Sequence, residues 1–214
     1  MQIIKNLIQK NKILTKFSLL ILNFFRRAAA TYKWRKLKSA NVIKLNIGAG
    51  GVKGTNDWKT IDLGNADISW DLRRGIALPD ASVDEIYSSH LLEHIRFADQ
   101  ITLLKECYRV LKIGGRLNIC VPNAGYYLRA YSAGKLFRER DTWHVSGAVN
   151  TGSVIDQINF VAYMGSEHKY MFDEENIIST LKLGGFEHVS QTQFGHELDD
   201  PNRAYESLYA EARK

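Results

Sequence analysis

The sequence has few cysteines and no long hydrophobic run. Cys107 and Cys120 are its two cysteines in 214 residues, too few for a disulfide framework. Both lie in stretches typical of buried helix or strand, so we expect reduced thiols in a reducing compartment. The most apolar run, residues 17–25, is far too short to cross a bilayer. Arg26 and Arg27 disfavour a secretory signal, so we expect a chain of the cytoplasm.

Acidic residues are absent from the first 40 positions. This segment has ten Lys or Arg, whereas the rest of the chain has 19 basic and 23 acidic residues, so the segment contributes +10 and the rest −4 to the net charge of +6. Apolar residues recur there at helical spacing, which predicts a basic amphipathic helical arm over residues 1–40. The arm either packs on the domain or lies on the inner face of an anionic membrane. No base-reading motif accompanies the charge, so nucleic acid is not an expected partner.

Several chemistries lack their sequence pattern. No spacing of His, Cys and acidic residues predicts a metal site, and no serine lies in a nucleophile elbow. The six-residue dinucleotide pattern fails because its last glycine would fall on Lys53. About seven residues separate Gly51 from the next expected strand, too few for a crossover helix. The failed dinucleotide pattern and the short connection after Gly51 disfavour a nicotinamide cofactor.

From residue 42 onward, strand-like and helix-like segments alternate. Strands are expected at 42–47, 58–62, 68–70, 83–88 and 116–121, and helical segments at 91–95 and 98–112. The alternation predicts an α/β fold with a mostly parallel sheet, whose ligands bind at the carboxyl ends of the strands.

Local signals add detail to this outline. Gly114 and Gly115 are expected to end the helix over 98–112, and Asp173 to cap a later helix. Residues 186–194 and 205–213 are expected to form a hairpin at the sheet edge. Residues 124–172 show the least regular pattern, and we interpret them as a lid or insertion over the active face.

A glycine-rich turn follows the first expected strand. Gly48 and Gly50 let a ligand approach the main chain, and their amides can bind an anionic group. Asp62 ends the second expected strand, where a carboxylate can accept both hydroxyls of an adenosine ribose. The combination predicts a nucleoside cofactor.

The sequence also resembles a known family. The matching stretches are LNIGAGG at 45–51, TIDL at 60–63, WDLRRGIALPDASVDEIYSSHLLEHI at 70–95, LLKECYRVLKIGGRLNICVPN at 103–123, HKYMFDEENIISTLKLGGFEHV at 168–189 and the closing ESLYAEARK. Over residues 42–214 the chain resembles the type 11 group of class I S-adenosylmethionine-dependent methyltransferases. Within that group it is most similar to small predicted methyltransferases of bacterial polysaccharide-biosynthesis clusters.

The resemblance implies a fold and a cofactor site. It implies a Rossmann-like methyltransferase domain over 41–214, with a mostly parallel seven-stranded sheet and an antiparallel C-terminal strand. It implies S-adenosyl-L-methionine as cofactor and S-adenosyl-L-homocysteine as product. The implied cofactor-binding residues are Gly48, Ala49, Gly50, Gly51, Asp62, Leu63, Asp71, Leu72, Ser88, Ser89 and His90.

The expected reaction is methyl transfer to a small-molecule or glycan acceptor, at oxygen. An oxygen acceptor needs a base. His144 is the first candidate, followed by His90 and Asp141. Glu93 and His94 resemble a catalytic pair, but we favour a structural role for them. The alternatives are a non-catalytic binding or scaffold protein of the same fold and, more remotely, a nicotinamide-dependent oxidoreductase.

Overall fold

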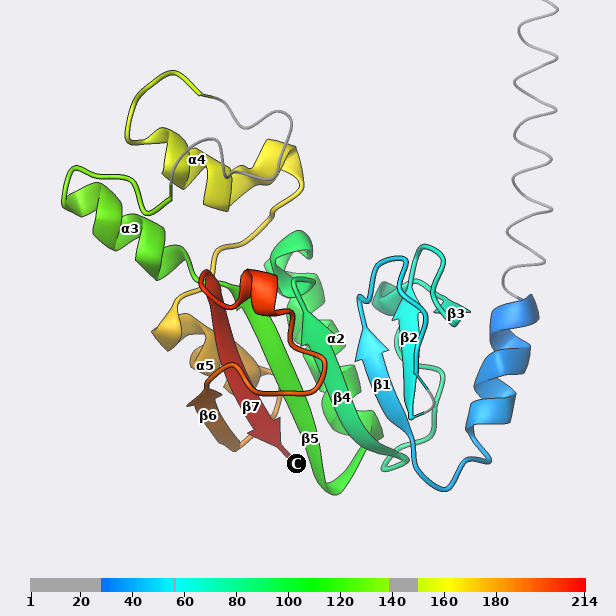
Figure 1. Ribbon diagram of the computed structural model, residues 1–214. Coiled ribbons are helices and arrows are strands. Elements are labelled where there is room, and N and C mark those ends of the chain that lie inside the picture. The colour runs from blue at the N-terminus through cyan, green and yellow to red at the C-terminus, as the bar shows by residue number, and fades with distance from the viewer. Residues whose placement is uncertain (1–27, 56, 139–149) are drawn as a thin grey trace, which may run out of the picture.

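A single seven-stranded sheet organises the molecule. The computed structural model describes residues 28–55, 57–138 and 150–214 (Figure 1). The strand order is β3-β2-β1-β4-β5-β7-β6, and β7 runs antiparallel to both of its neighbours while the other pairs are parallel. The strands are β1 Lys44–Ile47, β2 Trp58–Asp62, β3 Ile68–Ser69, β4 Val83–Ser89, β5 Leu111–Pro122, β6 His188–Thr192 and β7 Ser207–Arg213. The predicted Rossmann-like methyltransferase sheet is confirmed, and so is the hairpin, in which β6 forms the edge.

Helices and short helical turns connect the strands. A helix covers the described residues 28–37. The others are α2 Phe97–Val110, α3 Ala124–Ser132, α4 Asp156–Tyr163 and α5 Glu174–Leu183, with 3₁₀ turns η1 Leu72–Arg74, η2 Leu92–His94, η4 Met164–Ser166 and η5 Pro201–Arg203. Asp173 caps α5 as predicted, because its carboxylate accepts the amides of Glu175 and Asn176. No helix among the described residues is long and apolar enough to span a membrane.

The predicted end of the helix before β5 is wrong. The helix ends at Val110 rather than at Gly114 and Gly115. Val110 and Leu111 are fully buried, and Leu111 already pairs with Val83 on β4. The next paired residue of β5 is Arg116, so residues 112–115 loop out of the ladder. Burial of two apolar side chains outweighed the glycine signal.

The segment expected to be irregular contains two helices. Figure 1 shows α3 and α4 next to each other beyond the end of β5. They enclose a small apolar core of their own, made of Ala124, Tyr127, Phe160 and Val161. Tyr127 donates a hydrogen bond to Glu206, directly before β7, at 3.0 Å. This pair of helices is therefore fixed to the sheet by a buried polar contact.

The two faces of the sheet are covered differently. Figure 1 shows α2 and α5 behind the sheet. On the other side, residues 193–206 contact side chains of β2 and β4: the Trp58 indole donates to Glu197 and the Tyr87 hydroxyl to Asp199. His196 stacks on Tyr87 with a centroid separation of 4.6 Å. A loop thus covers this face and leaves the carboxyl ends of the strands open to ligands.

The helix over residues 28–37 belongs to the packed structure. Ala30, Trp34 and Leu37 are buried in the main core, and Trp34 meets Trp70 edge-on at 6.0 Å. Lys33 donates a hydrogen bond to the Asp67 carbonyl. The last turns of the predicted arm therefore pack on the domain, while residues 1–27 lie outside the described residues.

Candidate functional site

The strand order reverses between β1 and β4. The chain runs from β1 outward to β2 and β3, then returns to place β4 on the other side of β1. Crossovers leave in opposite directions at such a point, so a crevice opens beyond the carboxyl ends of the two strands. Gly48 follows β1 directly and His90 follows β4. The predicted glycine turn and the predicted residue His90 therefore border the same crevice.

The backbone at Gly48 needs a glycine for two reasons. Its φ of +71° lies in the left-handed region, and an added Cβ would lie 2.7 Å from the Leu91 side chain. Its amide donates to the Ile61 carbonyl at 2.8 Å, which ties the turn to β2. The turn is thus held close to the end of β2, where Asp62 lies.

Asp62 braces two turns at once. One carboxylate oxygen accepts the Gly50 amide at 3.0 Å and the other accepts the Gly64 amide at 2.8 Å. Each oxygen retains a second lone pair. Asp62 also lines the adjoining cavity, so both oxygens can accept a further pair of hydroxyls from a ligand. A carboxylate at this position can accept both hydroxyls of a ribose.

A cavity of about 350 Å³ occupies this place, which we call the cofactor cavity. Its volume lies in the range of small-molecule sites. Of the predicted cofactor residues, Gly48, Asp62, Leu63, Asp71 and Leu72 line it. Leu63 offers an exposed apolar side chain, and Trp70, Leu91 and Ile95 add apolar surface. A carboxylate, a bare main chain and apolar walls fit an adenosine carrying an amino-acid tail.

Asp71 is held by its neighbour. Its carboxylate accepts hydrogen bonds from the Arg73 guanidinium at 2.9 and 2.8 Å and from the Arg73 amide. The Arg73 side chain holds the pKa of Asp71 below its usual range. Asp71 therefore stays ionised at the rim of the cofactor cavity.

Other predicted cofactor residues do not line this cavity. Ala49, Gly50 and Gly51 continue the turn beyond it, and Gly50 acts through its bond to Asp62. Ser88 is buried at the end of β4, and its hydroxyl has no hydrogen-bond partner among the described residues. Ser89 ends β4 opposite Cys120. Both serines thus lie at the carboxyl end of β4 without lining the cofactor cavity.

A second cavity of about 400 Å³ lies beyond β4, β5 and β7, and we call it the acceptor cavity. It is lined by His90, Glu93, His94, Pro122, Tyr127, Phe160, Val161, Met164, Glu167, His168, Asp200, Asn202, Arg203 and Glu206. The lining is rich in acids, imidazoles and aromatic rings. His94 lines both cavities, so they share a wall at η2.

His90 is buried in an unusual backbone conformation. Its φ is +49°, which is uncommon for a residue with a side chain. Its Nε2 lies 3.0 Å from the Ser207 hydroxyl and its Nδ1 lies 3.4 Å from Glu93. Burial lowers the pKa of His90 to about 3, so the ring is neutral at physiological pH.

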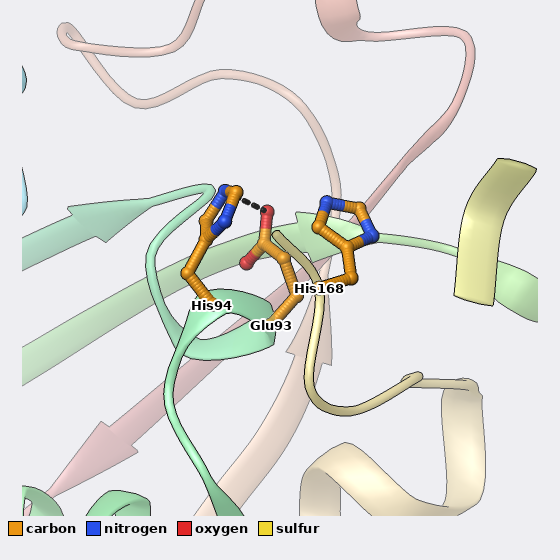
Figure 2. Close-up of side chains that lie close together, drawn as sticks. All are labelled: Glu93, His94 and His168. Atoms are coloured by element: carbon orange, nitrogen blue, oxygen red, sulfur yellow. Dashed lines mark ion pairs between the residues drawn. The ribbon is translucent and has the colours of Figure 1, made fainter. Parts of the chain in front are cut away.

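Glu93 lies deep between two further imidazoles. Figure 2 shows its carboxylate between the rings of His94 and His168. One oxygen lies 3.9 Å from His94 Nε2, and burial raises the pKa of Glu93 to about 8. Neither oxygen accepts a hydrogen bond from another described residue. The sequence pattern His90-x-x-Glu93-His94 was the available signal for this cluster, but His168 joins it only through the fold.

The remaining predicted residues cannot be placed. His144 and Asp141 lie in 139–149, outside the described residues. The structure instead adds residues that the sequence analysis did not propose for the cofactor site. Lys169 lines the cofactor cavity because its amide donates to the Glu93 carbonyl at 2.7 Å, which fixes this distant segment to η2. Nothing in the local sequence indicates that long-range contact.

Comparison with known proteins gives a consistent picture. Residues 28–119, less than half of the chain, match the family model described as a methyltransferase domain. A probable S-adenosylmethionine-dependent methyltransferase of Mycolicibacterium smegmatis is 40% identical over 57 residues, which are 25% of this chain and 21% of that protein. The chain thus spans about a fifth of that curated relative's length in the matched part.

Solved structures show similar arrangements at low sequence identity. A SAM-dependent methyltransferase from Archaeoglobus fulgidus is 16% identical, with a TM-score of 0.49 and coverage of 88% of this chain and 94% of that one. One from Aquifex aeolicus is 14% identical, with a TM-score of 0.48 and coverage of 86% and 88%. The fold assignment itself rests on the strand order of this chain. That sheet and the domain match support a class I S-adenosylmethionine-dependent methyltransferase.

Proposed function

We propose that this protein transfers a methyl group from S-adenosyl-L-methionine to a hydroxyl oxygen of a small polar acceptor, a glycan or a nucleotide sugar. The observation that carries the proposal is the pair of cavities on either side of His94. One has the carboxylate and open backbone for a nucleoside, and the other has a polar, aromatic lining. A donor and an acceptor bound there would approach each other at the shared wall.

In this proposal the chain mainly binds and aligns its ligands. When bound, S-adenosyl-L-methionine supplies a methyl group on a positively charged sulfur, which is already activated for displacement. Asp62 would hold the ribose, with Leu63 and Leu72 against the adenine. Alignment and exclusion of water then supply most of the acceleration.

An oxygen acceptor must also lose a proton. A neutral His90 with a pKa of about 3 is a weak base at physiological pH. Its contacts with Ser207 and Glu93 instead suit a role in positioning other groups. His144 stays the first candidate base and Asp141 the next. We expect His144→Ala to lower the rate of methyl transfer while leaving cofactor affinity unchanged. Unchanged turnover in this variant, measured with a competent acceptor, would rule out that base.

Cofactor binding can be tested without knowing the acceptor. Calorimetry should show S-adenosyl-L-methionine and S-adenosyl-L-homocysteine binding to the wild type and no heat with NAD. Asp62→Asn should weaken both by roughly 10- to 100-fold, because hydrogen bonds to a charged group are worth about 1.5–3 kcal/mol. Glu187→Gln, at an exposed residue next to β6, is the matched control and should bind normally. Absence of heat and of any thermal shift would favour a scaffold protein, and binding of NAD alone an oxidoreductase.

The cellular setting belongs to the same proposal. Resemblance to methyltransferases of polysaccharide clusters supports a surface-polysaccharide precursor as acceptor. The basic segment 1–40 supports a cytoplasmic protein that meets the inner face of the membrane. Binding to vesicles with and without anionic lipid, measured on the full chain at two salt concentrations, tests this contact. Equal retention on neutral vesicles would count against it.

A further inference from the structure

A buried carboxylate without a hydrogen-bond partner is the least explained group in the acceptor cavity. Glu93 is 2% exposed, and neither of its oxygens accepts a hydrogen bond from another described residue. A charged carboxylate in such a place is costly unless a proton or a cation compensates it. One Glu93 oxygen lies 3.4 Å from His90 Nδ1 and 3.9 Å from His94 Nε2, so imidazole nitrogens are the groups at hand.

His168 has one ring nitrogen available for a metal ion. His168 is buried, and its Nδ1 lies 2.7 Å from the Val161 carbonyl, which can accept only if Nδ1 carries the proton. Its other ring nitrogen is then an unprotonated lone-pair donor, and Figure 2 shows it on the side of the Glu93 carboxylate. A backbone carbonyl that fixes the tautomer in this way is typical of metal-binding histidines.

We propose that Glu93, His94 and His168 form a binding site for a divalent transition-metal ion. One donor atom from each residue lies within 4.8 Å of the others, so small side-chain shifts bring all three to about 2.0–2.2 Å from a common centre. Two imidazoles and one carboxylate suit zinc, manganese or iron(II) better than calcium or magnesium. Three protein ligands leave coordination positions open, as catalytic metal sites do.

The position of this site gives it a role in the proposed methyl transfer, on which this part of the inference rests. His94 lines both cavities, so the ion would lie where donor and acceptor meet. A divalent cation lowers the pKa of a hydroxyl group beside it. The acceptor hydroxyl would release its proton to solvent and its oxygen would bond to the methyl carbon. The carbon–sulfur bond would break and leave its electron pair on sulfur. The acceptor class is thus a hydroxyl compound that can contact a metal.

Metal binding can be measured directly on the full chain. After chelation and dialysis, calorimetry with Zn²⁺ and with Mn²⁺ should show one equivalent bound, and Co²⁺ should give visible absorption bands of a low-coordinate site. Glu93→Gln keeps the side-chain shape and should weaken binding by roughly 100-fold or more. His168→Gln should do the same. His188→Ala removes an exposed histidine on β6 and should leave binding unchanged.

The outcomes separate this inference from the proposed function. Absence of metal uptake by the wild type, or uptake that survives in Glu93→Gln, would overturn the site and leave Glu93 with a structural role. Metal binding without S-adenosyl-L-methionine binding would support the metal site and contradict the methyltransferase proposal. Methyl transfer that chelation does not slow would leave the site intact but remove its catalytic role. The thermal stability of metal-free Glu93→Gln, expected to equal that of the wild type, reports whether the variant folds.

Discussion

At the scale of single residues, two neighbouring glycines have different roles. A Cβ on Gly48 would lie 2.7 Å from Leu91, whereas a Cβ on Gly50 would meet nothing within 4 Å. Both have positive φ, which costs an alanine about 1–2 kcal/mol. Gly48→Ala should therefore also displace Leu91 into the cofactor cavity and weaken S-adenosyl-L-methionine binding by roughly 10-fold or more. Gly50→Ala adds no clash and should weaken the affinity less than Gly48→Ala does, so equal affinity losses in calorimetry would contradict this distinction.

Glu106 on α2 holds the loop before β4 through hydrogen bonds that depend on its ionisation. Its carboxylate accepts the Arg109 guanidinium and the Ile76 amide, and these contacts, the Arg109 bond foremost, hold its pKa below the usual range. The stabilisation is therefore fully present above the ordinary pKa of about 4.5 and is lost as the pH falls through the lowered folded value. Glu106→Gln should cost about 1 kcal/mol at pH 7.

The difference between Glu106→Gln and wild type should shrink on acidification. Melting temperatures measured from pH 7 to about pH 3 test this, because only the wild type has this carboxylate to protonate. A constant difference at all pH values would show that Glu106 acts by packing alone.

At the scale of elements, the helix over residues 28–37 has one buried face and one exposed face. Trp34 is buried against Trp70, while Tyr32 on the same helix is 69% exposed. Trp34→Ala should cost about 3–5 kcal/mol, since it removes a large side chain from a packed core. Tyr32→Ala is the control on the same helix and should cost less than about 0.5 kcal/mol. Denaturant unfolding measures both, and similar values would mean that this helix is not part of the cooperative core.

At the scale of the whole molecule, the two cavities lie over different parts of the sheet. The cofactor cavity lies at β1 and β2, whereas Glu206 at the other cavity joins α3 to β7 through Tyr127 and also pairs with Arg138 at 3.0 Å. Glu206→Gln should weaken the attachment of α3 to β7, because Tyr127 and Arg138 lose a buried charged partner. We expect the KM for the acceptor to rise roughly 10-fold. The affinity for S-adenosyl-L-methionine should not change. A parallel loss of cofactor affinity would show that the two cavities are not independent.

Several features followed from local sequence because their causes are local. The glycine turn, the acid that ends β2 and the Asp173 cap each depend on residues a few positions apart, and all appear where they were expected. The alternation of apolar segments likewise gave the mostly parallel sheet. Its antiparallel C-terminal strand was expected both from the predicted hairpin over 186–194 and 205–213 and from the family resemblance.

The tertiary structure decided where distant segments meet. Gly114 and Gly115 did not end a helix, because burial of Val110 and Leu111 ended it earlier. The approach of His168 to Glu93 joins positions 75 residues apart. Sequence by itself determined the approximate positions of the sheet strands and the glycine turn after β1, since spacing and backbone sterics act over a few residues. The fold alone decided which polar groups were buried together, because that depends on contacts that no local pattern records.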